Sequence, residues 1–452
     1  MNEQNPTETR FGKRTGLVQI HAGFVKRCDF SFDARLDCPG NQPDCILLDD
    51  ARVLSLHQNQ LVFGGNVHAY QSGQRVSRAE VISHLALIGP DPWRADELVR
   101  RISFCRRGID HLFMHTEKQR RIVQTNSFSE EDIRLFHVQI GGETYGADHL
   151  VSLSSNNPIP RIDDIRFWIE FPDGCPLREL RHRLMGYLSF LSFLCNRRVS
   201  PSSVRMGKTL AADTTRPGHE VIWSWPDTGL QTEACPVWKA PFAGGDDEDL
   251  SAVAEGLSCW IKRVDKWEAA YLRMMTCLEA TEEISSERML TAWRWFERLP
   301  DAKEENVLDA QAIAPLADAA FAVAQQQGLD ISKGRIKGSL KVLCKEGLEQ
   351  RLRRLVASAM RGTDTGDIWA SMVKDIVAGR DIRGAAAHGN LSHSGQQGAV
   401  QRALSASATE AFCFLFTARD LPLTSARRER LRHHPLVAAY IHLLAANRTS
   451  SP

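Results

Sequence analysis

The residues of this sequence that are best suited to catalysis are an arginine and a histidine near the end of the chain. They lie in residues 367–390, DIWASMVKDIVAGRDIRGAAAHGN, where Gly-Ala-Ala-Ala separates Arg383 from His388. These small residues leave room beside the imidazole for a ligand or a second chain. A histidine exchanges a proton near neutral pH, and an arginine offers a planar fork of charged donors that suits phosphate. The pair predicts chemistry on a phosphate ester.

RNA cleavage without a metal ion fits these two residue types. The histidine takes the 2′-hydroxyl proton or protonates the departing 5′ oxygen, while the arginine stabilises the extra negative charge on phosphorus. DNA lacks the 2′-hydroxyl nucleophile, so RNA is the expected substrate. The spacings of Cys28, Cys38 and Cys45 match no zinc ligand pair. We therefore expect neither a metal nor another cofactor.

A helix is expected to position the pair. Asp367 is a suitable N-cap, and Gly389-Asn390 directly after His388 is a suitable stop, which predicts a helix over residues 367–388. A helix C-terminus also favours the imidazolium form of a histidine by about 0.3–1 kcal/mol.

The helical geometry bears on how the two side chains meet. Steps of seven from Arg383 lead to Ile376 and Trp369, so the arginine shares an apolar stripe and needs a partner or a substrate. Five residues at 100° each place Arg383 and His388 about 140° apart around a helix. One helix cannot easily converge them, whereas an isologous interface repeats the same patch. We predict a site shared across a homodimer formed through the helical domain.

The segment resembles the HEPN superfamily, whose signature is an arginine followed after four to six residues by a histidine, here Arg383-GAAA-His388. A more specific resemblance is to the Apea-like HEPN proteins of bacteria, in which a β-rich region precedes the helical domain. The stretch FWIEFPDGCPLRELRHRLMGYLSFLSFLCNRRVSPSSV resembles the strand, helix and strand of those proteins. CLEATEEI and WFERL resemble a helical pair that carries Glu279 and Glu297.

The resemblance implies an RNA endonuclease of a conflict system, which typically defends a bacterium against phage by damaging RNA and arresting growth. It also implies that the N-terminal region responds to a phage-derived or cellular trigger. The family commonly has asparagine directly after the arginine, where this chain has Gly384. Arg380 and Asp381, which precede the arginine, are candidate supporting polar residues.

Composition sets the class of protein. A chain of 452 residues exceeds one ordinary core, and 43% hydrophobic with 25% charged residues is typical of folded globular proteins. A net charge of +1 means that any contact with nucleic acid must be local. The polar N-terminus lacks the apolar core of a signal peptide, and the apolar stretch 184–195 is too short to span a bilayer. We expect a cytoplasmic protein with no membrane contact.

The pattern along the chain predicts an α+β multidomain protein. Short β-prone runs separated by turn residues over 11–170 indicate a sandwich-like region, and an amphipathic helix is expected near 176–197. We expect a disordered tail over 1–10, a β-rich sensor region over 11–245, a HEPN-type helical bundle over 249–446 and a tail over 447–452. The predicted helices of the bundle cover residues 249–284, 286–299, 309–327, 333–359, 367–388, 399–419 and 426–446.

Other interpretations remain open at this point. Arg383 and His388 also fit a helix end with a capping histidine and an arginine bonded to a carboxylate. Gly384 favours a non-catalytic HEPN module that binds RNA or a nucleotide. A third alternative is a β-sandwich ligand-binding protein with a helical dimerisation domain. The basic segments at 351–354 and 427–435 are expected to be solvated helix residues, and Trp293, Trp295 and Phe296 to be core.

Overall fold

The structure is a computed structural model of residues 1–452, and it describes part of the chain in detail. Backbone alone is described for the strands within residues 1–96 and for 219–223. The described ranges beyond residue 96 are 97–106, 109–113, 115–125, 129–154, 157–210, 219–223, 240–242, 244–278, 285–307, 309–359, 366–380, 382–383 and 396–449. Contacts divide the chain into two compact units, residues 1–262 and 263–452, and each is described by itself.

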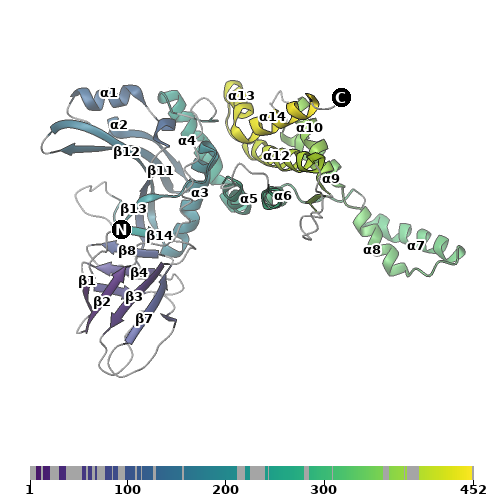
Figure 1. The fold of residues 1–452 in the computed structure, drawn as a ribbon, viewed down its shortest axis with the longest axis horizontal. Coiled ribbons are helices and arrows are strands. Elements are labelled where there is room, and N and C mark those ends of the chain that lie inside the picture. Colours follow the sequence, from purple (N-terminus) through teal and green to yellow (C-terminus); the bar gives the residue numbers. More distant parts are fainter. Residues whose placement is uncertain are drawn as a thin grey trace. The chain divides into compact units, whose positions relative to one another are not determined.

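The N-terminal unit contains two sheets. A nine-stranded mixed sheet has the order β10-β11-β12-β9-β13-β14-β8-β4-β5, and a five-stranded sheet has the order β1-β2-β3-β7-β6 (Figure 1). The strands are β1 Thr7–Phe11, β2 Arg14–Ile20, β3 Phe30–Leu36, β4 Val53–His57, β5 Gln60–Phe63, β6 Val67–His68, β7 Ser77–Ser83, β8 Leu85–Gly89, β9 Val99–Cys105, β10 Arg134–Ile140, β11 Glu143–Ser154, β12 Asn157–Cys175, β13 Ser202–Gly207 and β14 His219–Trp223.

A helix covers the best described strands of the large sheet. Helix α3, Leu177–Cys195, follows a proline that starts it and ends at Asn196 in the left-handed conformation (φ 52°). Its Tyr187 hydroxyl donates to the Gly146 carbonyl of β11 at 3.0 Å, and the Tyr187 ring lies 5.7 Å from that of Phe104 on β9. The expected α+β layout is confirmed, and the predicted helix at 176–197 is α3. On these strands the covering layer is a helix rather than a second sheet.

The remaining elements of this unit are short helices and α4. Within residues 11–170, where short strands were expected, Asp110–Phe113 instead forms a 3-10 turn and Thr116–Thr125 forms helix α1. A helical turn, α2 Glu130–Ile133, precedes β10. Helix α4, Asp247–Lys262, packs on β10 and α3, where the Trp260 indole donates to the Ser189 hydroxyl at 2.9 Å. The contacts thus divide the chain after Lys262, rather than at the expected boundary near residue 245.

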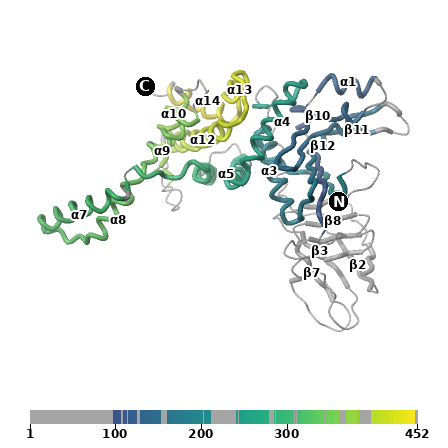
Figure 2. The backbone as a smooth tube through the Cα atoms, turned by 180° about the vertical axis from the view of Figure 1, so that it is seen from behind, coloured from purple at the N-terminus to yellow at the C-terminus, as the bar shows by residue number. Residues whose placement is uncertain are grey.

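The C-terminal unit is helical. Its helices are α5 Val264–Cys277, α6 Ser286–Arg298, α7 Ala310–Gln326, α8 Lys333–Leu343, α9 Leu348–Ala359, α10 Gly366–Ala378, α12 Gln396–Ala418, α13 Ser425–His433 and α14 Pro435–Thr449. Every residue of α12 from 404 to 418 is buried, which makes α12 the central helix of this unit. Helices α6, α10 and α14 pack against it (Figure 2).

Three predicted helices are each divided in two. The prediction over 249–284 breaks at Arg263, whose guanidinium donates to the Tyr271 hydroxyl at 2.6 Å and to the Thr417 carbonyl at 2.7 Å. The prediction over 333–359 breaks where an isolated bridge joins Asn306 to Lys345. The prediction over 426–446 breaks at His434, which stacks on Phe414 with ring centroids 3.7 Å apart.

The ends of the chain also differ from the expected tails. Strand β1 begins at Thr7, and α14 continues to Thr449. No helix in the described part of the chain is long and apolar enough to cross a membrane.

Candidate functional site

Arg383 lies in a short helical turn that follows α10. Its backbone N–H donates to the Gly379 carbonyl at 2.9 Å, as in a helical turn. The helix predicted over residues 367–388 is thus interrupted, because α10 ends at Ala378. Ile376 and Trp369, which share the predicted stripe with Arg383, are 0% and 2% exposed. The predicted apolar stripe is therefore confirmed, and Arg383 lies at its end.

Three contacts hold α10 in place and so position Arg383. The Trp369 ring meets the Phe412 ring of α12 edge to face, with centroids 5.5 Å apart. The Tyr440 hydroxyl of α14 donates to the Asp375 carboxylate at 2.8 Å, and burial raises the pKa of that carboxyl. At the end of α10, the Gly379 backbone approaches α12 so closely that a Cβ would lie 1.7 Å from the Ser405 Oγ.

Helix α6 supplies the surroundings of Arg383. Ser285 caps its N-terminus, and Arg288 forms a two-pronged pair with Glu410 of α12, at 2.9 and 2.8 Å. Glu410 is 1% exposed, so this pair fixes α6 on the buried central helix. Trp293 and Glu297 follow on α6, and a spacing of four places them on one helical face.

The Arg383 guanidinium is held between these two side chains. It donates to the Glu297 carboxylate, and its Cζ lies 5.3 Å from the centre of the Trp293 ring. The Arg383 and Glu297 side chains are 39% and 42% exposed, whereas Trp293 is 3% exposed and belongs to the core. The site is thus a half-exposed arginine that rests on a buried indole and is oriented by one carboxylate.

The other residues predicted for this site have different outcomes. Arg380 is exposed. Asp381, Gly384 and His388 lie outside the described residues, as does Glu279. The structure therefore brings Arg383 together with Trp293 and Glu297, and its relation to His388 stays a prediction. The prediction that Trp293, Trp295 and Phe296 are core residues is confirmed, since all three are at most 3% exposed.

This arrangement is suited to binding an anion. Arg383 carries five N–H donors, Glu297 accepts from one of its nitrogens, and the side chain is 39% exposed, so further donors are available to a phosphate. The carboxylate also lowers the local positive charge. The bond between Arg383 and Glu297 also fits the alternative interpretation, in which the arginine is bonded to a carboxylate and has only a structural role.

Ion pairs account for the basic segment at 351–354. Arg353 pairs with Glu349 at 2.6 Å, Arg351 with Glu304 at 3.7 Å and Arg354 with Glu305 at 3.0 Å. Arg351 and Arg354 thus join α9 to the segment before α7, and Arg353 pairs within α9, which fits a structural role.

A lysine stripe on α8 went unnoticed in the sequence. Lys333, Lys337, Lys341 and Lys345 recur at every fourth position, and no acidic residue lies between them. Lys333 pairs with Asp318 of α7 and Lys345 with Glu304 at 3.4 Å, while Lys337 and Lys341 are exposed. The four-residue repeat was the available signal, because it places Lys333, Lys337 and Lys341 along one face of α8, and Lys345 follows just after this helix ends.

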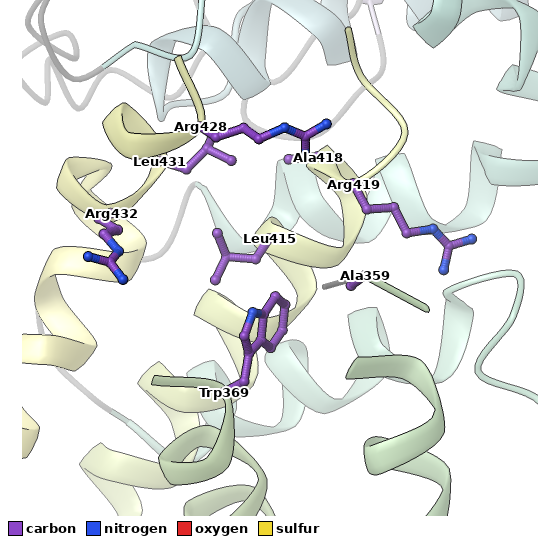
Figure 3. A pocket seen from close by; sticks show the side chains of 8 residues that line it. All are labelled: Ala359, Trp369, Leu415, Ala418, Arg419, Arg428, Leu431 and Arg432. Carbon is purple, nitrogen blue, oxygen red and sulfur yellow. The ribbon is translucent and has the colours of Figure 1, made fainter. Parts of the chain in front are cut away.

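A small cavity beside α10 offers no binding site for an organic molecule. It has a volume of about 10 Å³, enough for about one water, and Trp369, Leu415 and Leu431 line it (Figure 3). Arg419 at its edge extends away from the apolar centre to bond Asp301. No group of three or more histidine, cysteine, aspartate or glutamate side chains suited to a metal ion occurs among the described residues.

Comparisons of this chain with protein-family models, with curated proteins and with solved structures find no match.

Proposed function

We propose that this chain is a metal-independent RNA endonuclease of the HEPN type, with Arg383 and His388 in a site shared by two copies, and that it acts as an abortive-infection effector against phage. The observation that supports the proposal is the half-exposed Arg383, held by Trp293 and Glu297 five residues before His388. The indole and the carboxylate together fix the orientation of its guanidinium.

The reaction follows from the chemistry of the pair. An imidazole takes the proton of the RNA 2′-hydroxyl, whose oxygen attacks the adjacent phosphorus. The bond from phosphorus to the 5′ oxygen breaks, and an imidazolium returns a proton to that oxygen. Arg383 stabilises the additional negative charge on phosphorus. The products are a 2′,3′-cyclic phosphate and a 5′-hydroxyl.

The lysine stripe of α8 supports RNA as the substrate. Successive lysines at a spacing of four are about 6 Å apart along the helix axis, which suits contact with a chain of phosphates. Open space surrounds Gly334 and Gly338 between them, so a polynucleotide can approach the helix. In a chain with a net charge of +1, this stripe is a local site of the kind that nucleic-acid binding requires.

Cleavage in the presence of EDTA tests the proposal. The purified protein should cut single-stranded RNA into fragments that end in 2′,3′-cyclic phosphate. His388→Ala and Arg383→Ala should each lower the rate at least about 10²-fold. Arg353→Ala, at an arginine that pairs with Glu349 on α9, is the matched control and should cut at the wild-type rate. Activity that survives His388→Ala, or that requires a metal, would refute the assignment.

A second candidate is a HEPN module that binds RNA without cutting it. The Arg383–Glu297 pair favours this alternative, because the carboxylate neutralises the cation that catalysis would use. It predicts salt-dependent RNA binding with no fragments at any protein concentration, and binding that His388→Ala leaves unchanged.

A further inference from the structure

A buried histidine of the N-terminal unit lines a cavity on the β11–β12 side of the large sheet. His149 on β11 is 3% exposed, and neither of its ring nitrogens has a hydrogen-bond partner among the described residues. It lies opposite Ile165 of β12 on the same sheet face as Ala147 and Tyr145. Most buried polar atoms in folded proteins are satisfied, so two orphaned nitrogens on one ring require an explanation.

The explanation lies in the cavity that His149 lines. The cavity has a volume of about 560 Å³, which is in the range of small-molecule sites. Helix α1 forms one wall with Gln119 and Val123, and β12 forms another with Ile162 and Ile165. The pairing of β11 with β12 shifts register at Leu150/Val151, next to His149. Such irregularities often redirect side chains beside a binding site.

The charges around the cavity determine which ligands fit. Asp110, Asp163 and Asp164 line it, with Arg161 as the accompanying cation, bonded to Asp163 at 3.2 Å. Burial, with smaller effects from His115 and Lys118, lowers the pKa of His149 to about 4. The imidazole is thus neutral at pH 7 and offers one donor and one acceptor. The wall as a whole is rich in acceptors and carries net negative charge.

We propose that this cavity binds a neutral amino-substituted heterocycle, whose ring nitrogen and amino group bond His149, Gln119 and the cavity's carboxylates. Ile162 and Val123 supply apolar surface for the flat ring. An anionic ligand is disfavoured, because it would meet the acidic residues Asp110 and Asp163 and a neutral imidazole. The site lies within the N-terminal unit and does not depend on the function proposed for the helical unit.

Three related probes test the chemistry: adenosine, inosine and adenosine monophosphate, titrated into the full-length protein by calorimetry without RNA. Adenosine should bind with a dissociation constant of roughly 1 mM or below. Inosine has a carbonyl in place of the amino group and should bind at least about tenfold more weakly, because it leaves acceptors unpaired. The added phosphate of the monophosphate should also weaken binding.

Variants locate the site. His149→Leu should lose adenosine binding about tenfold or more, while His137→Gln, at an exposed histidine on neighbouring β10, should bind like the wild type. Val123→Trp, at a half-exposed α1 position, should occupy the part of the cavity beside α1 and weaken binding even if His149→Leu fails to fold. Adenosine binding that is absent, no tighter than inosine binding, or insensitive to Val123→Trp would overturn the proposal.

Discussion

At the scale of single residues, Arg383 differs from an ordinary surface arginine because two side chains of one helical face fix its guanidinium. Lysine would keep the charge at this position, but it lacks the planar fork that bonds Glu297 and stacks on Trp293. We expect Arg383→Lys to slow RNA cleavage about 10²-fold in single-turnover assays. Arg353→Lys is the matched control. Equal rates for Arg383→Lys and the wild type would show that charge alone is sufficient.

The titration of His149 predicts a pH dependence of stability. Its pKa falls from 6.5 to about 4 on folding. Between these pH values, His149 is therefore protonated in the unfolded chain and neutral in the folded chain. The free energy of unfolding should therefore decrease as the pH falls from 6.5 to 4, by about 3 kcal/mol at most. Asp148, on the opposite sheet face, acts in the other direction, because burial raises its pKa to about 6.

Urea unfolding at several pH values separates these contributions. His149→Leu removes the histidine contribution and leaves that of Asp148, so this variant should lose less stability than the wild type between pH 6.5 and 4.5. Parallel stability curves for the two proteins would contradict the assignment of this pKa to His149.

Sequence patterns identify residues more readily than their partners. The steps of seven predicted that Arg383 ends an apolar stripe, which the burial of Ile376 and Trp369 confirms. The pairing with Glu297 joins positions 86 apart in the sequence, and helical periodicity carries no information about such a contact. His149 gave no signal, because its orphaned nitrogens arise from packing between α1 and the sheet.

At the scale of elements, the contact of α10 with α12 controls where Arg383 lies. An added methyl group at Gly379 would lie 2.4 Å from the Ser405 Cβ, a clash that rotation of the serine cannot relieve. We expect Gly379→Ala to cost about 1–3 kcal/mol of stability and to reduce RNA cleavage further, since it displaces the turn that carries Arg383.

Another helical glycine provides the control for this change. Gly338 on α8 has nothing within 4 Å of the added methyl group, so Gly338→Ala should be neutral or stabilise by about 1 kcal/mol. Thermal unfolding of both variants tests the comparison. Equal stability changes would mean that the Gly379 contact does not constrain α10.

Helix positions were largely predictable, whereas two of the three breaks were not. The helical spacing of apolar residues continues through Arg263 and through Cys344. The sequence therefore shows no break at these positions, because tertiary contacts interrupt the helices there. Arg263 bonds the Thr417 carbonyl, and Lys345 bridges to Asn306. The break at His434 had a visible signal in Pro435, which favours the first position of a new helix.

At the scale of the whole molecule, composition indicated a change of architecture near residue 245, but contacts place the division after Lys262. Helix α4 belongs with the N-terminal unit because Leu250, Val253, Leu257 and Trp260 are all buried there. A sequence pattern shows that α4 has an apolar face and leaves open which unit covers that face.

A site built from two chains predicts that mixing two inactive variants restores activity. Arg383→Ala and His388→Ala chains, each inactive alone, should regain about a quarter of wild-type cleavage after joint refolding. Half of the randomly formed dimers are mixed. Each mixed dimer has one intact site, with Arg383 from one copy and His388 from the other, and one site that lacks both residues. No recovery, in a mixture shown to contain mixed dimers, would contradict a shared site.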